Sequence, residues 1–340
     1  MDCGAQEAPS NLSYFSMITS LVLSAITIPG NFLVLLAVHK DPHKELRKPF
    51  TIFVANLALA DFTAGSVTEP TASYYTIQEA RGGVVEGFAV YITHLSYFMS
   101  CTTSVLTLGV LAIDRYLVIS HSLWYKAHVT MESAAKVCIF VWIVSITLSM
   151  VYIKTGFISF AFVFANTAVL TTSCVLVFSY YSIFKTLRSR TVRVGVLHEG
   201  VNQCSEGHVK SLMLENKLIK LYMMMLGIFL FCFVPSCAFI YVLYFCSVCD
   251  CITIHWLRDM SFLLVLVSSS LNPLLYSLRM KAFRKAFKSM LSFQRKSVKV
   301  GIHLDEPALS LENPDKVKDV SITVTVSRET SGDISPLQNP

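Results

Sequence analysis

Seven long stretches of mostly apolar residues dominate this chain. They cover residues 14–38, 50–74, 88–119, 134–153, 157–185, 216–245 and 257–279. A helix needs about 20 mostly apolar residues to cross the hydrocarbon core of a bilayer, and every stretch is at least that long. In lipid only helices and closed barrels satisfy every backbone N–H and C=O group, and barrel strands are only about 10 residues long. The pattern predicts an all-α membrane protein, a seven-transmembrane helix bundle.

Charged residues are scarce, and most of them fall between the apolar stretches. They make up 15% of the chain, against about 25% in an average soluble domain. The first apolar stretch is too long for the core of a cleavable signal peptide, and no basic residue precedes it, so we interpret it as a membrane helix. We find no P-loop or Gly-x-Ser-x-Gly motif, and therefore do not expect an enzyme.

The chain divides into three predicted segments. Residues 1–13 form an extracellular tail, residues 14–291 the membrane domain, and residues 292–340 a disordered cytoplasmic tail. Residues 281–291 alternate basic and apolar residues at helical spacing, which predicts a short amphipathic eighth helix on the membrane surface. A basic flank that only stops translocation is the alternative for this segment.

Basic residues in the connections predict the orientation. One side of the membrane carries Lys and Arg in the first loop, in residues 187–214 and after the seventh stretch, whereas the other side offers only Arg81, Lys154 and Arg258. The side richer in Lys and Arg is normally cytoplasmic. We therefore expect a multi-pass plasma-membrane protein with its N-terminus outside and its C-terminus in the cytoplasm. The net charge of +6 suits anionic membrane lipid, and we find no nucleic-acid signal.

Polar motifs interrupt the apolar stretches in order along the chain. Charged residues inside membrane spans are costly and mark functional sites. The motifs are Gly30-Asn31, Asn56-Leu57-Ala58-Leu59-Ala60-Asp61, Asp114-Arg115-Tyr116, Trp142, Cys232-Phe233-Val234-Pro235 and Asn272-Pro273-Leu274-Leu275-Tyr276. Together they resemble the rhodopsin-like (class A) G-protein-coupled receptor family over residues 14–291, and the two tails take no part in the resemblance.

The resemblance implies a function. Such a receptor transmits binding of an extracellular small molecule, lipid or peptide to a heterotrimeric G protein through outward movement of the sixth helix. It also implies arrestin and receptor kinases as partners of the Ser/Thr-rich tail, where phosphorylation adds negative charge. A solvated linker is the alternative for that tail.

The resemblance also implies an activation switch. Arg115 is expected to be held inactive by Asp114 and by Glu215, which lies 20 residues before Pro235. Tyr180 and Tyr276 match tyrosines that face this arginine in active family members. The complete set is Asp114, Arg115, Tyr116, Tyr180, Glu215, Phe233, Pro235, Asn272, Pro273 and Tyr276. The alternatives are a solvated loop charge at Glu215 and interfacial aromatics at the two tyrosines.

A cation site is implied in the middle of the membrane. Asp61, Ser104, Ser269 and Asn272 match positions that surround an allosteric sodium ion in the family. One carboxylate with neutral oxygens suits a small hard cation. The alternative is a protonated Asp61 hydrogen-bonded to Asn31 and Asn272. No other cofactor is expected.

Departures from the family pattern narrow the subfamily. Val90 stands where a bridged Cys normally begins the third helix, Thr172 replaces the usual Pro of the fifth, and the short loop at Lys154 has no Cys. These features resemble the melanocortin, cannabinoid, lysophospholipid and adenosine receptor group. Melanocortin receptors carry an acid in the third helix, where this chain has only uncharged Tyr97.

The predicted ligand pocket lies between the outer halves of the helices. Family placement gives Glu69, His94, Tyr97, Phe233, Phe239 and Leu266 as lining residues. The set is mainly apolar and aromatic, so it favours a lipid or a small, weakly charged molecule over a cationic amine. Ordinary helix packing is the alternative for these residues.

Cysteines at the outer side predict disulfides. Cys246, Cys249 and Cys251 cluster in the third outer loop, and Cys3 lies in the outer tail. Four cysteines allow three pairings; we expect one bridge within the loop and a second tying Cys3 to it, with a metal site as the alternative. Asn11 begins a glycosylation sequon that ends at Ser13.

Two other functions compete with a ligand receptor. An opsin needs a lysine in the seventh helix for retinal, and residues 262–276 contain none. A transporter or channel is the remaining alternative, although transporters often show repeat symmetry and paired broken helices, and neither is visible in this sequence.

Overall fold

The structure is a computed structural model that describes residues 8–83, 87–198 and 206–297. Within these ranges, the side chains of residues 187, 189–198, 206–223, 276–279 and 291–297 are not described. The described residues form helices joined by short connections, with no strand among them. The all-α fold class is therefore confirmed.

Within the described residues, seven helical spans are long and apolar enough to cross a membrane, which confirms the predicted number. Four spans are single or nearly single helices: α1 (Ser10–Lys40), α4 (Gly87–Ser120), α10 (Glu206–Phe245) and α11 (Cys251–Arg279). The other three are composite: α2 (Pro49–Thr63) with η1 (Ala64–Thr68) and α3 (Glu69–Ala80); α6 (Met131–Ser149) with α7 (Tyr152–Thr155); and α8 (Phe157–Phe164) with η2 (Ala165–Val169) and α9 (Leu170–His198).

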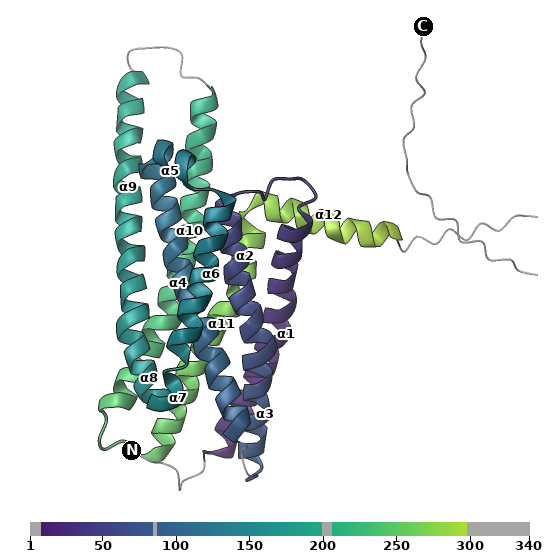
Figure 1. Ribbon diagram of the computed structural model, residues 1–340, viewed down its shortest axis with the longest axis vertical. Coiled ribbons are helices and arrows are strands. Elements are labelled where there is room, and N and C mark those ends of the chain that lie inside the picture. Colours follow the sequence, from purple (N-terminus) through teal and green to yellow (C-terminus); the bar gives the residue numbers. More distant parts are fainter. Residues whose placement is uncertain (1–7, 84–86, 199–205, 298–340) are drawn as a thin grey trace, which may run out of the picture. The chain divides into compact units, whose positions relative to one another are not determined.

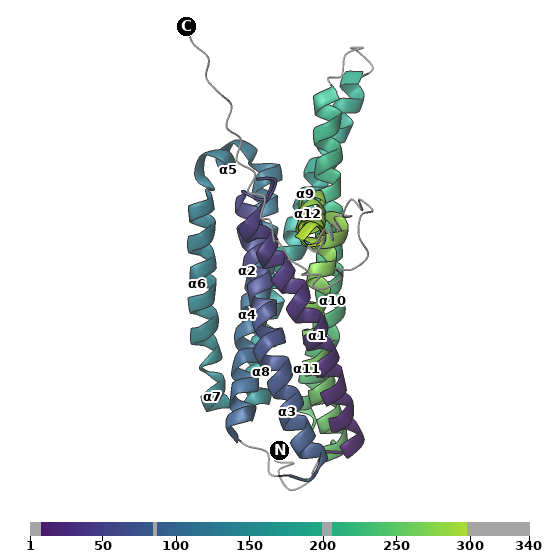
Figure 2. The same cartoon turned by 90° about the vertical axis from the view of Figure 1, so that its right-hand side faces the viewer.

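The spans run side by side as a bundle (Figure 1). We call the end at which α1 begins the N-terminal end. The opposite end carries α5 (Ser122–His128) and α12 (Lys281–Ser297), and we call it the α12 end. Figure 2 shows α6 at one edge of the bundle, next to α2 and α4. Most side chains of α4 are buried, so this helix forms the centre of the core.

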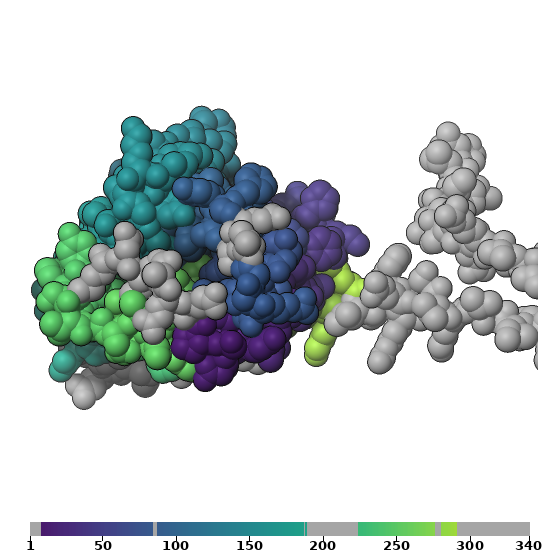
Figure 3. Space-filling model, turned by 90° about the horizontal axis from the view of Figure 1, so that it is seen from below, coloured from purple at the N-terminus to yellow at the C-terminus, as the bar shows by residue number. Residues whose placement is uncertain are grey.

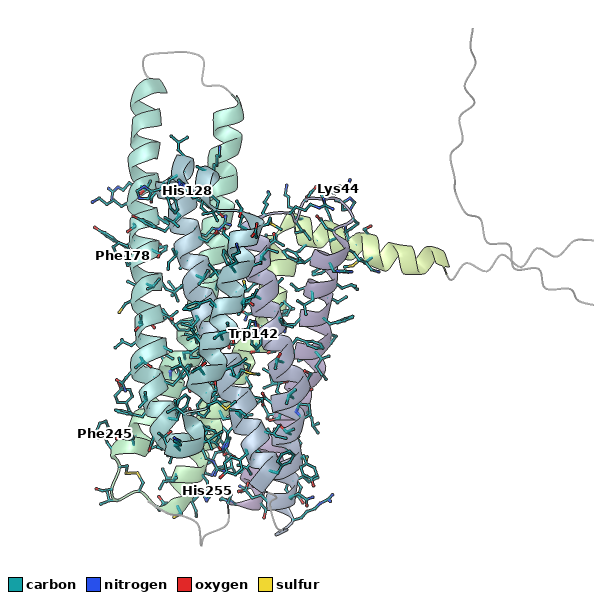
Figure 4. All side chains as sticks on the ribbon, viewed as in Figure 1. Lys44, His128, Trp142, Phe178, Phe245 and His255 are labelled. Carbon is teal, nitrogen blue, oxygen red and sulfur yellow. A yellow bond between two sulfur atoms is a disulfide. The ribbon has the colours of Figure 1, made fainter. Side chains whose placement is uncertain are left out.

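Large apolar side chains face outward along the spans. Examples are Phe32 and Phe140, which are among many exposed aromatic and aliphatic residues. Such a surface is unfavourable in water but suits lipid, because lipid tails are as apolar as these side chains. Hydrogen bonds between spans add to the apolar packing of the core: Trp142 Nε1 donates to Asn56 Oδ1 at 2.9 Å, and Asn56 Nδ2 donates to Thr107 Oγ1 at 2.8 Å. Figure 4 shows Trp142 midway along the bundle.

Several helices begin earlier than the apolar pattern predicts, and two of these starts bear on the site. α1 begins at Ser10 rather than residue 14, so the predicted tail 1–13 includes its first turn. α11 begins at Cys251 rather than residue 257, because Asp250 caps it: Asp250 Oδ1 accepts from Thr253 Oγ1 at 2.7 Å, and Asp250 Oδ2 accepts from Thr253 N at 3.3 Å. These hydrogen bonds from Thr253 lower the pKa of Asp250 below its usual value.

Close helix contacts require glycine at two positions. A Cβ atom on Gly30 would lie 3.1 Å from Pro273 Cγ, and one on Gly65 would lie 2.9 Å from Thr27 Cγ2. Gly65 belongs to the π-helical segment η1, and its carbonyl accepts a hydrogen bond from Ser24 Oγ at 2.9 Å. The first contact joins α1 to α11, so the first and last spans are neighbours and the ring of helices is closed.

The predicted eighth helix is confirmed as α12. It turns away from the axis of the bundle (Figure 1), and its apolar residues Phe283 and Ala286 are buried. Arg284 and Lys288 are exposed, as an amphipathic surface helix requires. Lys285 forms an ion pair of 2.6 Å with Glu45 in the connection between α1 and α2. This ion pair holds the pKa of Glu45 below its usual value.

Candidate functional site

An ion pair closes the α12 end of α4. Arg115 Nη2 lies 2.9 Å from Asp114 Oδ2, and both side chains are almost fully buried. The guanidinium carbon of Arg115 also lies 4.0 Å from the centre of the Phe50 ring on α2. A cation over an aromatic face is stabilised by about 0.5–2 kcal/mol. Arg115 is therefore held between its own neighbour on α4 and a ring on α2.

A third residue binds the same carboxylate. The hydroxyl of Tyr125, on α5, donates to Asp114 Oδ1 at 2.6 Å. Burial, and then the hydrogen bond to Asp114, raise the pKa of Tyr125 above its usual value, so its hydroxyl remains a donor across the physiological pH range. Neither Tyr125 nor Phe50 was among the residues predicted for this site. The sequence gives no local signal for them, because each contact joins two separate helices.

The other predicted switch residues occupy several places. Tyr116 packs against His121 and Phe178, while Tyr180 is half-buried on α9 beside Phe184. Further along the core, Phe233 stacks on Phe229 with 4.7 Å between ring centres. Pro235 lies inside α10 and Pro273 inside α11. The side chains of Glu215 and Tyr276 lie outside the described residues, so the Arg115–Glu215 contact stays a prediction.

The residues predicted to hold a cation meet in the middle of the bundle. Asp61 is buried on α2; its Oδ1 accepts from Ser104 Oγ on α4 at 3.1 Å, and its Oδ2 accepts from Asn272 Nδ2 on α11 at 2.7 Å. Ser269 is buried beside them. Its carbonyl accepts from Asn31 Nδ2 on α1 at 3.1 Å. Four spans therefore meet around one carboxylate.

This arrangement fits a small hard cation. Among the described residues, no Lys, Arg or His forms an ion pair with Asp61, although a buried charge is costly without a partner. Asn31 Oδ1 is also buried without a hydrogen-bond partner, which leaves a neutral oxygen free in the same region. Within the described ranges, no cluster of three or more His, Cys, Asp or Glu side chains is present. The donor set is thus one carboxylate with hydroxyl and amide oxygens, which suits sodium better than a transition metal.

A cavity of about 650 Å³ opens at the N-terminal end. Figure 3 views this end, where α1 (purple), α3 and α4 (blue) and α10 and α11 (green) meet. Of the predicted pocket residues, only His94 lines this cavity; its Nδ1 lies 2.8 Å from the hydroxyl of Tyr152. Phe157 lines it too, and Tyr97 packs beneath Phe157, stacked on Phe262 at 4.5 Å.

The remaining predicted pocket residues lie elsewhere in the core. Leu266 is buried, Phe239 is half-buried and Phe233 packs as described above. Glu69 is fully buried against α1, where its Oε1 accepts from Thr27 Oγ1 at 3.3 Å. Glu69 directly follows η1, and a π-helical turn changes which face of the helix the next residues occupy. Roles for these four residues in ligand binding stay predictions.

The cavity is bordered by a cluster of charged residues, and this cluster was not predicted from the sequence. Arg258 lines the cavity, and its Nε donates to Asp259 Oδ1 at 2.9 Å. Arg258 Nη2 lies 3.9 Å from Glu79 Oε1 on α3. Ser16 and Ser13 of α1 donate to the two acids. The signal was available: with α11 starting at Cys251, Arg258 and Asp259 are ionisable residues inside a span rather than loop charges.

A disulfide joins Cys246 to Cys249 in the connection between α10 and α11, next to the cavity. Cys251 is also disulfide-bonded. Cys3 lies outside the described residues, so its predicted pairing stays a prediction. Asn11 is exposed in the first turn of α1, and its glycosylation likewise stays a prediction.

Comparison with known proteins gives one consistent result. The family model described as "7 transmembrane receptor (rhodopsin family)" matches residues 30–276. Melanocortin receptor 5 of Pan troglodytes is 24% identical over 278 residues, which cover 80% of this chain and 82% of that protein. The histamine H2 receptor of Canis lupus familiaris is 26% identical over 304 residues, which cover 83% of this chain and 80% of that protein. The histamine H2 receptor of Cavia porcellus is 25% identical over 291 residues, which cover 79% of this chain and 77% of that protein. None of these comparisons supports a transporter or channel. The chain belongs to the rhodopsin family of seven-transmembrane receptors and is a G-protein-coupled receptor.

Proposed function

We propose that this receptor lies in the plasma membrane with its N-terminal end outside, and that a ligand bound at that end releases Arg115 for a heterotrimeric G protein at the α12 end. The observation that carries the proposal is the closed arrangement around Asp114, which pairs with Arg115 and accepts from Tyr125. A latch of this kind is a two-state element whose equilibrium a distant ligand is able to shift.

The proposed orientation rests on charge. Lys44, Arg47 and the exposed basic face of α12 lie at the α12 end, and this excess of cations is typical of the cytoplasmic side. Glycosylation of Asn11 tests this orientation, because asparagine residues are glycosylated only on the lumenal side of the endoplasmic reticulum, which becomes the outside of the cell. Glycosidase treatment should lower the apparent mass of the wild type but not of Asn11→Gln. A protease-protected N-terminal tag in intact cells would contradict the orientation.

Exposed apolar residues on α5 support a partner at this end. Leu123 is 84% exposed and Trp124 50% exposed, on a helix that lies beyond the membrane spans. Apolar side chains held outside both lipid and core are typical of protein interfaces. We assign Leu123 to the G-protein contact. Leu123→Ala should weaken coupling at unchanged surface expression.

The central experiment measures second messengers without ligand. Cyclic AMP and calcium are read in cells that express the wild type, Glu215→Ala or Arg115→Ala, with surface expression measured for each. Glu215→Ala should raise the basal signal and Arg115→Ala should abolish it, and the responding pathway identifies the G-protein class. Equal output from all three receptors at equal surface expression would contradict the latch.

The C-terminal tail supplies the remaining partners. Residues 298–340 lie outside the described residues and contain Ser321, Thr323, Thr325 and Ser327. We propose that receptor kinases phosphorylate these residues and that arrestin binds the product. Replacing all four by alanine should reduce arrestin recruitment while leaving the G-protein signal intact, and unchanged recruitment would contradict the assignment.

A further inference from the structure

We propose that the cavity at the N-terminal end binds a single-chain amphiphile whose anionic head, a carboxylate or phosphate, is held by Arg258. The inference rests on the proposed function in one respect, namely that this end of the receptor takes the ligand.

The cavity presents a single full charge, and it is positive. Arg258 is the only Lys or Arg among the described residues that line the cavity, and no Asp or Glu lines it. A cationic amine would therefore meet no carboxylate on the cavity wall. An anion would meet the guanidinium, whose planar array of N–H groups matches carboxylate and phosphate oxygens.

The two nearby acids orient Arg258 without occupying the cavity. Asp259 is buried behind it; one of its oxygens accepts from Arg258 Nε and the other from Ser16. Glu79 Oε2 accepts from Ser13, and its Oε1 is 3.9 Å from Arg258 Nη2, too far for a hydrogen bond. Arg258 Nη2 is consequently buried with no hydrogen-bond acceptor. Because Nη2 is shielded from the cavity in this structure, the guanidinium must turn for a ligand oxygen to supply the missing acceptor; recognition then rests on directed hydrogen bonds as well as charge.

His94 also lines the cavity and provides a second polar contact. Its Nδ1 is engaged with the hydroxyl of Tyr152, so Nε2 is the nitrogen left for a ligand. When the tyrosine donates to Nδ1, the neutral imidazole carries its hydrogen on Nε2 and offers a donor. A donor here complements the same oxygen-rich head.

Thr155, Ser159 and Ser247 add neutral polar groups to the lining, and its apolar part reaches the outer surface of the bundle. Phe157, Leu243 and Ile254 line the cavity together with Tyr244 and Phe245. Tyr244 is 46% and Phe245 67% exposed on the outer side of α10, and Figure 4 shows Phe245 at the edge of the bundle. A chain lying in the bilayer therefore meets the apolar wall first. The volume of about 650 Å³ lies within the usual range for a small-molecule site.

The test measures binding apart from signalling. The full-length receptor is purified into nanodiscs of neutral lipid, and its melting temperature is followed while oleate, lysophosphatidate, monoolein or oleylamine is titrated in. These probes share one chain and differ in the head. One or both anionic probes should raise the melting temperature, and which one does identifies the head as carboxylate or phosphate. An equal shift with monoolein, or a larger one with oleylamine, would overturn the proposal.

Variants locate the binding site. Arg258→Gln should weaken the effective anionic probe by about tenfold or more, as expected for loss of a hydrogen bond to a charged group. Arg81→Gln removes an exposed arginine at the same end and should bind normally. Arg258→Gln leaves Asp259 and Glu79 without their cationic partner. If the variant fails to fold for this reason, two other variants are measured: the double variant Arg258→Gln with Asp259→Asn, and the single variant His94→Phe. Unchanged affinity in all of them would overturn the proposal. Intact binding without any second-messenger response would instead count against the proposed function alone.

Discussion

Tyr125 donates a hydrogen bond of 2.6 Å to Asp114, so a residue of the short helix α5 shares the carboxylate that pairs with Arg115. The three side chains come from two helices that lie on different sides of a turn. Movement of α5 therefore changes the environment of Arg115 through the shared carboxylate of Asp114.

We expect Tyr125→Phe to raise ligand-free signalling. The change removes one hydrogen bond to a charged group, worth about 1.5 kcal/mol, which corresponds to roughly a tenfold shift in an equilibrium. Basal second-messenger output at matched surface expression measures it. Tyr181→Phe, which alters an exposed tyrosine on α9, should leave the output unchanged. A lower basal signal in Tyr125→Phe would show that the bond stabilises the active state instead.

We expect sodium to stabilise the receptor through Asp61. The melting temperature of the purified wild type should rise when sodium chloride replaces choline chloride at constant ionic strength, because a ligand that binds only the folded state stabilises it. Asp61→Asn, which keeps the shape but removes the charge, should abolish the difference between the two salts. Asp250→Asn serves as the control, since Asp250 lies outside the spans. A sodium response that survives in Asp61→Asn would place the ion elsewhere.

We expect Gly65→Ala to destabilise the bundle. The added methyl group would lie 2.9 Å from Thr27 Cγ2, and overpacking of this kind costs about 1–3 kcal/mol. Gly227→Ala is the matched control, because nothing lies within 4 Å of its added Cβ. The melting temperature of each variant measures the effect. Thr27→Ser removes the clashing methyl and keeps the hydroxyl, so the double variant should recover part of the loss; no recovery would mean that the clash is not with Thr27.

We expect the Glu45–Lys285 ion pair to contribute little and to respond to pH. Both side chains are about half exposed, and ion pairs of this type are weak and screened by salt. The folded-state pKa of Glu45 is lowered, so its contribution is present above the ordinary pKa and is lost as pH falls through the lowered value. The small difference in melting temperature between the wild type and Glu45→Gln should therefore be seen at pH 7 and vanish at strongly acidic pH. A difference that persists in acid or in concentrated salt would contradict the ion pair.

The bundle itself was predictable from the sequence, because the need to cover about 30 Å of lipid leaves a direct record in runs of apolar residues. The contact between Asp61 and Asn272 was also predictable, since polar side chains inside membrane spans form hydrogen bonds with one another. The start of α1 was not, because Ser13 looks like a tail residue until the structure pairs it with Glu79.

The remaining features of the site depend on contacts between segments that are far apart in the sequence, and these could not be predicted. The sequence does not reveal that Tyr125 reaches Asp114, because the chain turns between them. Glu69 shows a different limit. Counting at 3.6 residues per turn does not reveal the π-helical segment before it, and the structure turns its side chain toward Thr27 on α1 rather than toward the cavity. Arg258 stands at the very start of the seventh predicted stretch, and only the start of α11 at Cys251 places it a full two turns inside the helix, beside the cavity.

The contact between Gly30 and Pro273, which closes the ring of helices, also orders the assembly of the receptor during synthesis. The ribosome delivers α1 and α2 to the membrane first, and the partners that α11 gives Asn31 and Asp61 are the last to arrive. An unsatisfied polar group in lipid costs several kcal/mol, so the early spans remain a target for chaperones and membrane proteases until α11 is inserted. Chains truncated before Ser269 should therefore be degraded rather than reach the cell surface, even though six of the seven spans are complete.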